Sequence, residues 1–152
     1  MKFVLIPSYL PSVLNFRGKL LALIAQQGYE IHILAPDVTL YNKDYKTLIG
    51  LGYHVHQIPM QRAGTNPIAD VKTFIAVYKL LTTIKPDYLL SYTIKPVIYG
   101  TLAAFLARVP YRFAMITGLG YAFQIEDGQE PSKTQKLIYE LYRQSLKWCE
   151  KV

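Results

Sequence analysis

The chain has 152 residues, which is the usual length of a single domain. Apolar residues make up 51% of it and charged residues 18%, so the composition excludes a disordered chain and allows a substantial core. The net charge of +7 favours an anionic partner such as nucleic acid, anionic lipid or a phosphate-bearing substrate, although a solvated basic surface explains it equally well.

The first half of the chain alternates short apolar runs with amphipathic segments. Proline or glycine ends most of these runs, and the segment Ser8–Gly18 is rich in turn residues. The predicted elements are a strand over Lys2–Pro7, a helix over Lys19–Gln27, a strand over Glu30–Ala35, a short helix over Asp44–Gly50 and a strand over His54–Pro59.

The second half repeats the same unit and completes an α/β domain. Its predicted elements are a helix over Asp70–Ile84, a strand over Asp87–Ser91, a helix over Val97–Leu106, a strand over Arg112–Ile116 and a helix over Ser132–Lys151. Small residues in the helix over Val97–Leu106 predict that it is the most buried. Five strands that alternate with helices predict a Rossmann-like, doubly wound parallel sheet with helices on both faces.

The histidines and the cysteine give little indication of a metal site or a catalytic site in the sequence. His32 lies inside a strand, where we expect a structural role, and His54 and His56 share one strand face. We expect no third ligand beside them, and therefore no metal. Cys149 is the only cysteine, which excludes an intramolecular disulfide, and we expect it to be half-buried on the last helix.

Parallel sheets bind their ligands at the carboxyl ends of the strands, so the turns there are the candidate site. Four turns qualify: Ser8–Gly18, Arg62–Pro67, Tyr92–Pro96 and Thr117–Tyr121. They offer the cations Arg17, Arg62 and Lys95 together with hydroxyl groups and glycines, a set that suits phosphate and sugar.

The usual enzyme signatures are missing from these turns. The first turn lacks the glycines of a dinucleotide fingerprint, and no phosphate-binding GxxxxGK is present. Among carboxylates, only Asp37 follows a strand, and a turn-forming role is the simpler interpretation. The residues alone therefore predict a binding surface without an acid/base pair.

The combination of NFRGKLLALIAQQGYEIHILAPD, RAGTNPIADVKTF, KPDYLLSYTIKPVIYGTLAAFLARVP and ITGLGYAF resembles the N-terminal domain of family 4 glycosyltransferases. It is most similar to the bacterial branch that adds hexosamine residues to polyprenyl-diphosphate-linked saccharides. The pairing of SYTIKP with TGLGYAF is its most specific part, and the resemblance runs from Met1 to the last helix.

The resemblance implies a GT-B architecture, in which two Rossmann-like domains face each other across a cleft. The N-terminal domain holds the acceptor, and the C-terminal domain holds a nucleotide-sugar, expected to be UDP-linked. Transfer is retaining and needs no cofactor or metal. We therefore expect residues 1–152 to form one acceptor-side domain that is inactive without its missing C-terminal Rossmann domain, whose donor-binding residues would follow Val152.

The resemblance also assigns roles within the turns. It places Arg17 and Gly18 near the acceptor's diphosphate, Thr93 and Lys95 against the diphosphate or sugar, and Arg62 at the rim. The reaction centre would be lined by Thr117, Gly118 and Gly120. Gly18 and Gly100 could instead serve close packing. Many relatives carry a histidine after the fifth strand, and this sequence has none there, so no catalytic base is assigned.

A lipid-linked acceptor implies a cytoplasmic enzyme held peripherally on the inner face of the cytoplasmic membrane, in surface polysaccharide or glycan synthesis. Basic and aromatic side chains could face the anionic membrane surface, or be a solvated rim: Lys79, Lys85, Arg108, Tyr111 and Arg112. The alternative is a non-catalytic scaffold subunit of a two-chain glycosyltransferase. Nucleic-acid binding is not expected, because charge is its only support.

Overall fold

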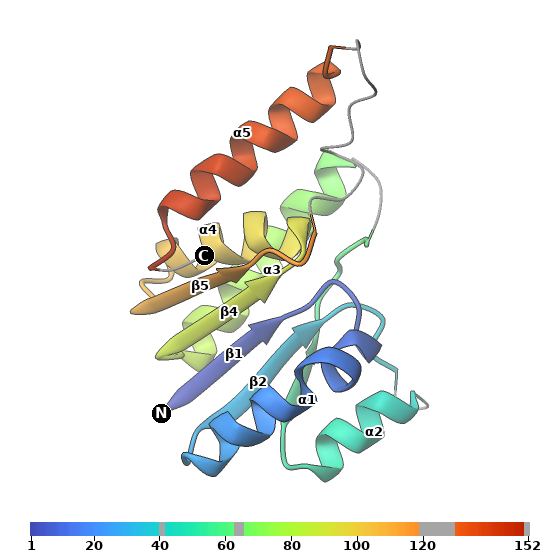
Figure 1. Ribbon diagram of the computed structural model, residues 1–152, viewed down its shortest axis with the longest axis vertical. Coiled ribbons are helices and arrows are strands. Elements are labelled where there is room, and N and C mark those ends of the chain that lie inside the picture. Colours follow the sequence, from blue (N-terminus) through green and yellow to red (C-terminus); the bar gives the residue numbers. More distant parts are fainter. Residues whose placement is uncertain (40–41, 63–65, 119–129, 151–152) are drawn as a thin grey trace.

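The protein is described by a computed structural model over residues 1–39, 42–62, 66–118 and 130–150, and it is a three-layer α/β structure (Figure 1). Its sheet has five parallel strands in the order β3-β2-β1-β4-β5. The strands are β1 (Lys2–Ile6), β2 (Glu30–Ala35), β3 (His54–Gln57), β4 (Tyr88–Tyr92) and β5 (Tyr111–Met115). The predicted doubly wound parallel sheet is confirmed.

Helices cover both faces of this sheet. On one face lie α1 (Pro11–Gln26) and α2 (Lys43–Gly50). On the other lie α3 (Pro67–Ile84), a π-helical turn η1 (Pro96–Gly100) that continues as α4 (Thr101–Leu106), and α5 (Lys133–Lys147). No helix within the described part of the chain is both long and apolar enough to cross a bilayer.

The central strand β1 shows why its sequence is apolar throughout. Phe3 and Leu5 pack into the core under α1, whereas Val4 and Ile6 pack into the core under α3 and α4. A strand that is buried on both faces has no solvent side on which a polar residue could alternate. The predicted strand over Lys2–Pro7 is confirmed to within one residue.

The start of α1 differs from the sequence prediction. We expected a turn over Ser8–Gly18 followed by a helix from Lys19, but the helix already begins at Pro11. Proline suits the first helical position because its φ is fixed near the helical value and its missing N–H would have no partner there. Arg17 and Gly18 therefore lie within a helix and not in a turn.

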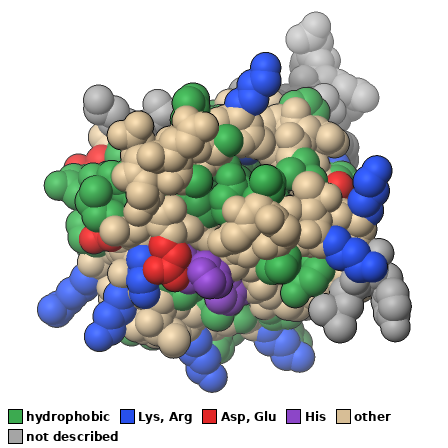
Figure 2. All heavy atoms as spheres, turned by 90° about the horizontal axis from the view of Figure 1, so that it is seen from below, with side chains coloured by type: hydrophobic (Ala, Val, Ile, Leu, Met, Phe, Trp, Pro, Cys, Tyr) green, Lys and Arg blue, Asp and Glu red, His purple; other side chains and the backbone are tan. Residues whose placement is uncertain are grey.

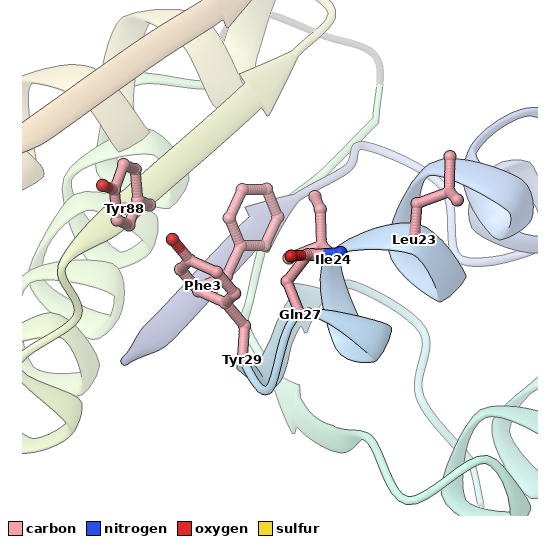
Figure 3. A pocket seen from close by; sticks show the side chains of 6 residues that line it. All are labelled: Phe3, Leu23, Ile24, Gln27, Tyr29 and Tyr88. Carbon is pink, nitrogen blue, oxygen red and sulfur yellow. The ribbon is translucent and has the colours of Figure 1, made fainter.

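A cavity of about 370 Å³ opens near the amino ends of β1 and β4 (Figure 3). Aromatic side chains from the sheet side face residues from the end of α1 across it. Its lining residues are Phe3, Leu23, Ile24, Gln27, Tyr29 and Tyr88. It lies at the opposite edge of the sheet from the carboxyl ends of the strands, so it is not part of the predicted site.

Two glycines give a matched test of the packing. A Cβ on Gly100 would lie 2.9 Å from Ile6 Cδ1, whereas a Cβ on Gly18 would meet nothing within 4 Å. Gly100→Ala is therefore expected to lower the free energy of unfolding by about 1–3 kcal/mol through overpacking. Gly18→Ala is expected to raise it by about 0.5–1 kcal/mol through helix propensity. Urea unfolding of both variants measures this, and equal effects would contradict the close approach of η1 to β1.

Candidate functional site

The chain reverses its direction of travel across the sheet between β1 and β4. The connection from β1 leads through α1 to β2 on one side, and the connection from β3 leads through α3 back to β4 on the other. Such a topological switch point is where open α/β sheets bind ligands, at the carboxyl ends of the two strands. The candidate site therefore centres on residues 7–10 after β1 and residues 92–95 at the end of β4.

Arg17 reaches this edge from α1 and rests on the end of β4. Its guanidinium carbon lies 5.1 Å from the centre of the Tyr92 ring, a cation–π contact. The Tyr92 hydroxyl lies 2.7 Å from Ser12 Oγ, and because Ser12 Oγ donates to the Tyr9 carbonyl, Tyr92 is the donor of this pair. Burial raises the pKa of Tyr92, which keeps the phenol protonated as that donor.

Two buried polar atoms at this edge have no hydrogen-bond partner among the described residues. They are Arg17 Nε and Thr93 Oγ1. Thr93 also has a φ of 71°, which a β-branched residue rarely adopts. Its carbonyl accepts a bond from the Val97 N–H and so joins β4 to the π-helical turn. Strained backbone and unpaired buried groups of this kind gather at functional sites.

Lys95 is not the free cation that the sequence suggests. Its ammonium lies 2.8 Å from Asp70 Oδ1, and both side chains are largely buried, with 15% and 13% exposure. The Tyr99 hydroxyl also bonds to Asp70. Burial, and then this hydrogen bond and the charge of Asp70, raise the pKa of Tyr99 well above its usual range. The phenol of Tyr99 therefore stays protonated beside the Asp70 carboxylate.

Arg62 forms the rim between two of the predicted turns. Its guanidinium carbon lies 4.7 Å from the centre of the Tyr9 ring, so it links the segment after β3 to the segment after β1. Both side chains are exposed. The predicted position of Arg62 at the rim of an acceptor site, and its role toward a substrate, stay predictions.

The turn after β5 is only partly described. Thr117 and Gly118 are exposed, and Gly118 has a φ of 148°, which favours glycine. Gly120 lies outside the described residues. The candidate site is therefore defined by α1 and β4, with the β5 turn as its neighbour across the sheet.

Sequence reasoning missed three residues that build this edge: Ser12, Asp70 and Tyr99. Asp37 does follow β2, but a second carboxylate lies at this edge, because Asp70 reaches Lys95 from the first turn of α3. A signal for it was present. Asn66 caps α3 and Pro67 takes its first position, so the next acidic residue had to lie at the same edge.

The predicted membrane-facing set does not lie at this edge. Lys85 and Arg108 precede β4 and β5, at the amino ends of the strands. Arg112 is engaged, because it donates to the Trp148 carbonyl at 2.7 Å and to Glu150 at 3.2 Å. It ties the end of α5 to β5 and is not available as a membrane anchor.

The histidines lie apart from the candidate site. His32 is buried and paired, as expected. The expectation that His54 and His56 have no further ligand near them is wrong, because β2 places Glu30 and His32 beside them. Burial lowers the pKa of His32, and burial with the nearby His54 lowers that of His56, so both rings are neutral near pH 7.

Comparison with known proteins supplies an independent finding. A family model described as glycosyl transferase 4-like matches residues 13–152. A curated relative from Campylobacter jejuni is 30% identical over 138 residues. Its name is N,N'-diacetylbacillosaminyl-diphospho-undecaprenol alpha-1,3-N-acetylgalactosaminyltransferase. The match covers 91% of this chain and 35% of the relative, so the chain spans about a third of that protein's length.

Solved structures show a similar fold at low sequence identity. MurG from Acinetobacter baumannii superposes with a TM-score of 0.53 at 18% identity, over 76% of this chain and 34% of that one. A UDP-GlcNAc 2-epimerase from Methanocaldococcus jannaschii superposes with a TM-score of 0.59 at 16% identity, over 100% of this chain and 45% of that one. These likenesses support the Rossmann-like sheet of GT-B enzymes.

Proposed function

Because this chain belongs to the glycosyl transferase 4-like family, we propose that it forms the acceptor-binding side of a glycosyltransferase. The enzyme would move a sugar from a nucleotide-sugar, UDP-linked in our proposal, to a polyprenyl-diphosphate-linked saccharide. The name of the Campylobacter relative describes transfer to a saccharide on diphospho-undecaprenol, which is an acceptor of this kind. Retention of anomeric configuration and a separate donor-binding domain are part of the proposal.

One observation carries this proposal: Arg17 Nε and Thr93 Oγ1 are both buried and unpaired at the switch point. Leaving a buried polar group unpaired costs about 1–3 kcal/mol, so a ligand that accepts from both would recover that cost. A guanidinium and a hydroxyl are donors that a diphosphate oxygen accepts. We propose that the acceptor's diphosphate lies against this pair.

Lys95 is the second cation beside the proposed diphosphate position. An ammonium has three N–H donors, and one of them goes to Asp70. The remaining donors can still reach a phosphate, but the Asp70 charge offsets the attraction of Lys95 for an anion. Arg17 therefore contributes more to diphosphate binding, and Lys95 contributes to orientation.

The helices that begin at this edge expose apolar side chains that suit a polyprenyl tail and peripheral membrane contact. Phe16 on α1 is 71% exposed, and Ile68 and Val71 in the first turns of α3 are 69% and 56% exposed. Exposed apolar side chains near a site often mark a lipid or protein contact. We propose that this rim faces the membrane that holds the acceptor.

Binding of a soluble acceptor probe tests the proposal. The probe is a farnesyl diphosphate that carries one N-acetylhexosamine, titrated into the chain by calorimetry. Arg17→Gln is expected to weaken binding at least tenfold, because it removes a charge-assisted donor worth about 1.5–3 kcal/mol. Lys19→Gln, an exposed lysine on the same helix, is the matched control and is expected to change affinity less than twofold. Equal losses of probe affinity in both variants would show that Arg17 acts only through net charge. That result would contradict a diphosphate site at Arg17.

A further inference from the structure

A cluster of metal-ligating side chains lies at the amino ends of β2 and β3, away from the candidate site. Glu30 and His32 are two residues apart on β2, and His54 and His56 are two residues apart on β3. Because strand side chains alternate, each pair points to one face, and the register sets His32 opposite His54. Figure 2 shows histidine side chains at the molecular surface beside an acidic side chain.

The donor atoms converge on one point. Glu30 Oε1 lies 2.9 Å from His32 Nε2 and 3.4 Å from His54 Nε2. All three atoms lie within 4.8 Å of one another. Ligands bound to zinc at about 2.0–2.1 Å in a tetrahedron lie about 3.3 Å apart. The two separations from Glu30 are close to this value, and the two histidine nitrogens, at most 4.8 Å apart, would move together by no more than about 1.5 Å.

From this geometry we propose that Glu30, His32 and His54 bind one divalent transition-metal ion, with Zn²⁺ as the best-suited ion. Two imidazoles and a carboxylate form a common three-ligand set for zinc, and a fourth position stays open for water. Imidazole nitrogens disfavour Mg²⁺ and Ca²⁺, which prefer oxygen ligands. The proposal does not depend on the proposed function.

His56 is placed to hydrogen-bond the ring nitrogen of His32 that would face away from the metal, as the partners of metal-bound histidines commonly do. His32 Nδ1 lies 3.0 Å from His56 Nε2. When Nε2 of His32 binds a metal, its Nδ1 carries the proton. This N–H then donates a hydrogen bond to His56 Nε2. This bond would fix the tautomer and the ring orientation of His32, which is only 7% exposed in its side chain.

An ion can reach the cluster from solvent. The side chains of His54 and Glu30 are 54% and 44% exposed, while His32 forms the buried floor. The ion would join β2 to β3, which is the edge strand of the sheet and has only four residues. The bound ion is expected to hold the outer strand β3 in place. It would take no part in sugar transfer, which is proposed for the carboxyl ends of the strands.

Zinc titration of untagged chain tests this site, with ZnCl₂ as the probe in calorimetry. We expect one Zn²⁺ per chain and a higher melting temperature with zinc than with EDTA. His54→Ala, an exposed change, is expected to weaken zinc binding at least tenfold, and so is Glu30→Gln. His56→Ala is expected to weaken zinc binding about tenfold or more, because it removes the hydrogen bond that orients the His32 ring. Cobalt binding should show the visible absorption of a tetrahedral site.

Cys149→Ser is the control, because Cys149 is the single cysteine of the chain and a thiol is a strong zinc ligand. Its half-buried thiol lies 3.9 Å from Thr101 Oγ1 and takes no part in the proposed ligand set. It is expected to leave the affinity and the stoichiometry unchanged. Three results would overturn the proposal: no saturable binding up to millimolar zinc, unchanged affinity in both His54→Ala and Glu30→Gln, or loss of binding in Cys149→Ser.

Discussion

Lys95→Met is expected to lower the free energy of unfolding by about 3 kcal/mol. The change keeps much of the side-chain volume but removes the cation 2.8 Å from the Asp70 carboxylate. Asp70 is only 13% exposed, and a buried charge that loses its partner costs about 3–5 kcal/mol. The Tyr99 hydroxyl remains as a donor and limits the loss. Chemical unfolding monitored by circular dichroism measures the change.

Two further variants show whether this loss belongs to the pair. Lys95→Met combined with Asp70→Asn removes both charges, so we expect it to be less destabilising than the sum of the single changes. Arg143→Met breaks an exposed pair with Glu140 and serves as the control, with an expected loss below about 0.5 kcal/mol. If Lys95→Met is as mild as Arg143→Met, the buried pair does not form in solution.

The second large effect concerns activity: this chain alone is expected to transfer no sugar. Its candidate site offers donors for an anion, and the nearby carboxylate, Asp70, is held by Lys95 and Tyr99 and is not free to act as a base. In the proposed function the nucleotide-sugar binds to a separate domain. Incubation of the chain with a UDP-sugar and the farnesyl diphosphate probe, followed by mass spectrometry, measures transfer.

A longer protein that joins this domain to a nucleotide-sugar domain is expected to form product under the same conditions. There, Arg17→Gln should lower kcat/KM for the acceptor at least tenfold, and Lys19→Gln should leave it within twofold. Turnover by the chain alone would show that it holds the donor as well, and would end the division of roles that we propose.

Strands were the most predictable part of the fold. The predicted strand Glu30–Ala35 matches β2 at both ends. Its mostly apolar run lies between Gly28 and Pro36, which mark the two boundaries of a short strand. The start of α1 was missed because Ser8, Asn15 and Gly18 have turn propensity in isolation, whereas packing of Val13 into the core extends the helix back to Pro11.

The candidate site was predictable in outline and not in its contacts. Arg17 and Lys95 follow from local motifs, and the carboxyl edge follows from the fold. Two contacts could not be predicted locally: Arg17 over the Tyr92 ring, and Lys95 with Asp70. Both depend on which helix packs against which strand, so they are set by tertiary packing.

The histidine cluster has the same origin. Each two-residue spacing is visible in the sequence, but only the pairing of β2 with β3 brings Glu30 and His32 to His54. Likewise, the left-handed backbone of Thr93 goes against its own propensity, so local sequence gives no sign of it.

The most direct test of the acceptor-side role is a comparison of two ligands on one chain. Isotope-labelled protein would be titrated with the farnesyl diphosphate N-acetylhexosamine probe and, separately, with UDP-N-acetylhexosamine, and followed by NMR. We predict saturable shifts at Arg17, Thr93 and Lys95 with the acceptor probe, and none there with the nucleotide-sugar. Shifts at these residues with the nucleotide-sugar but not with the acceptor probe would contradict the assignment of this domain to the acceptor.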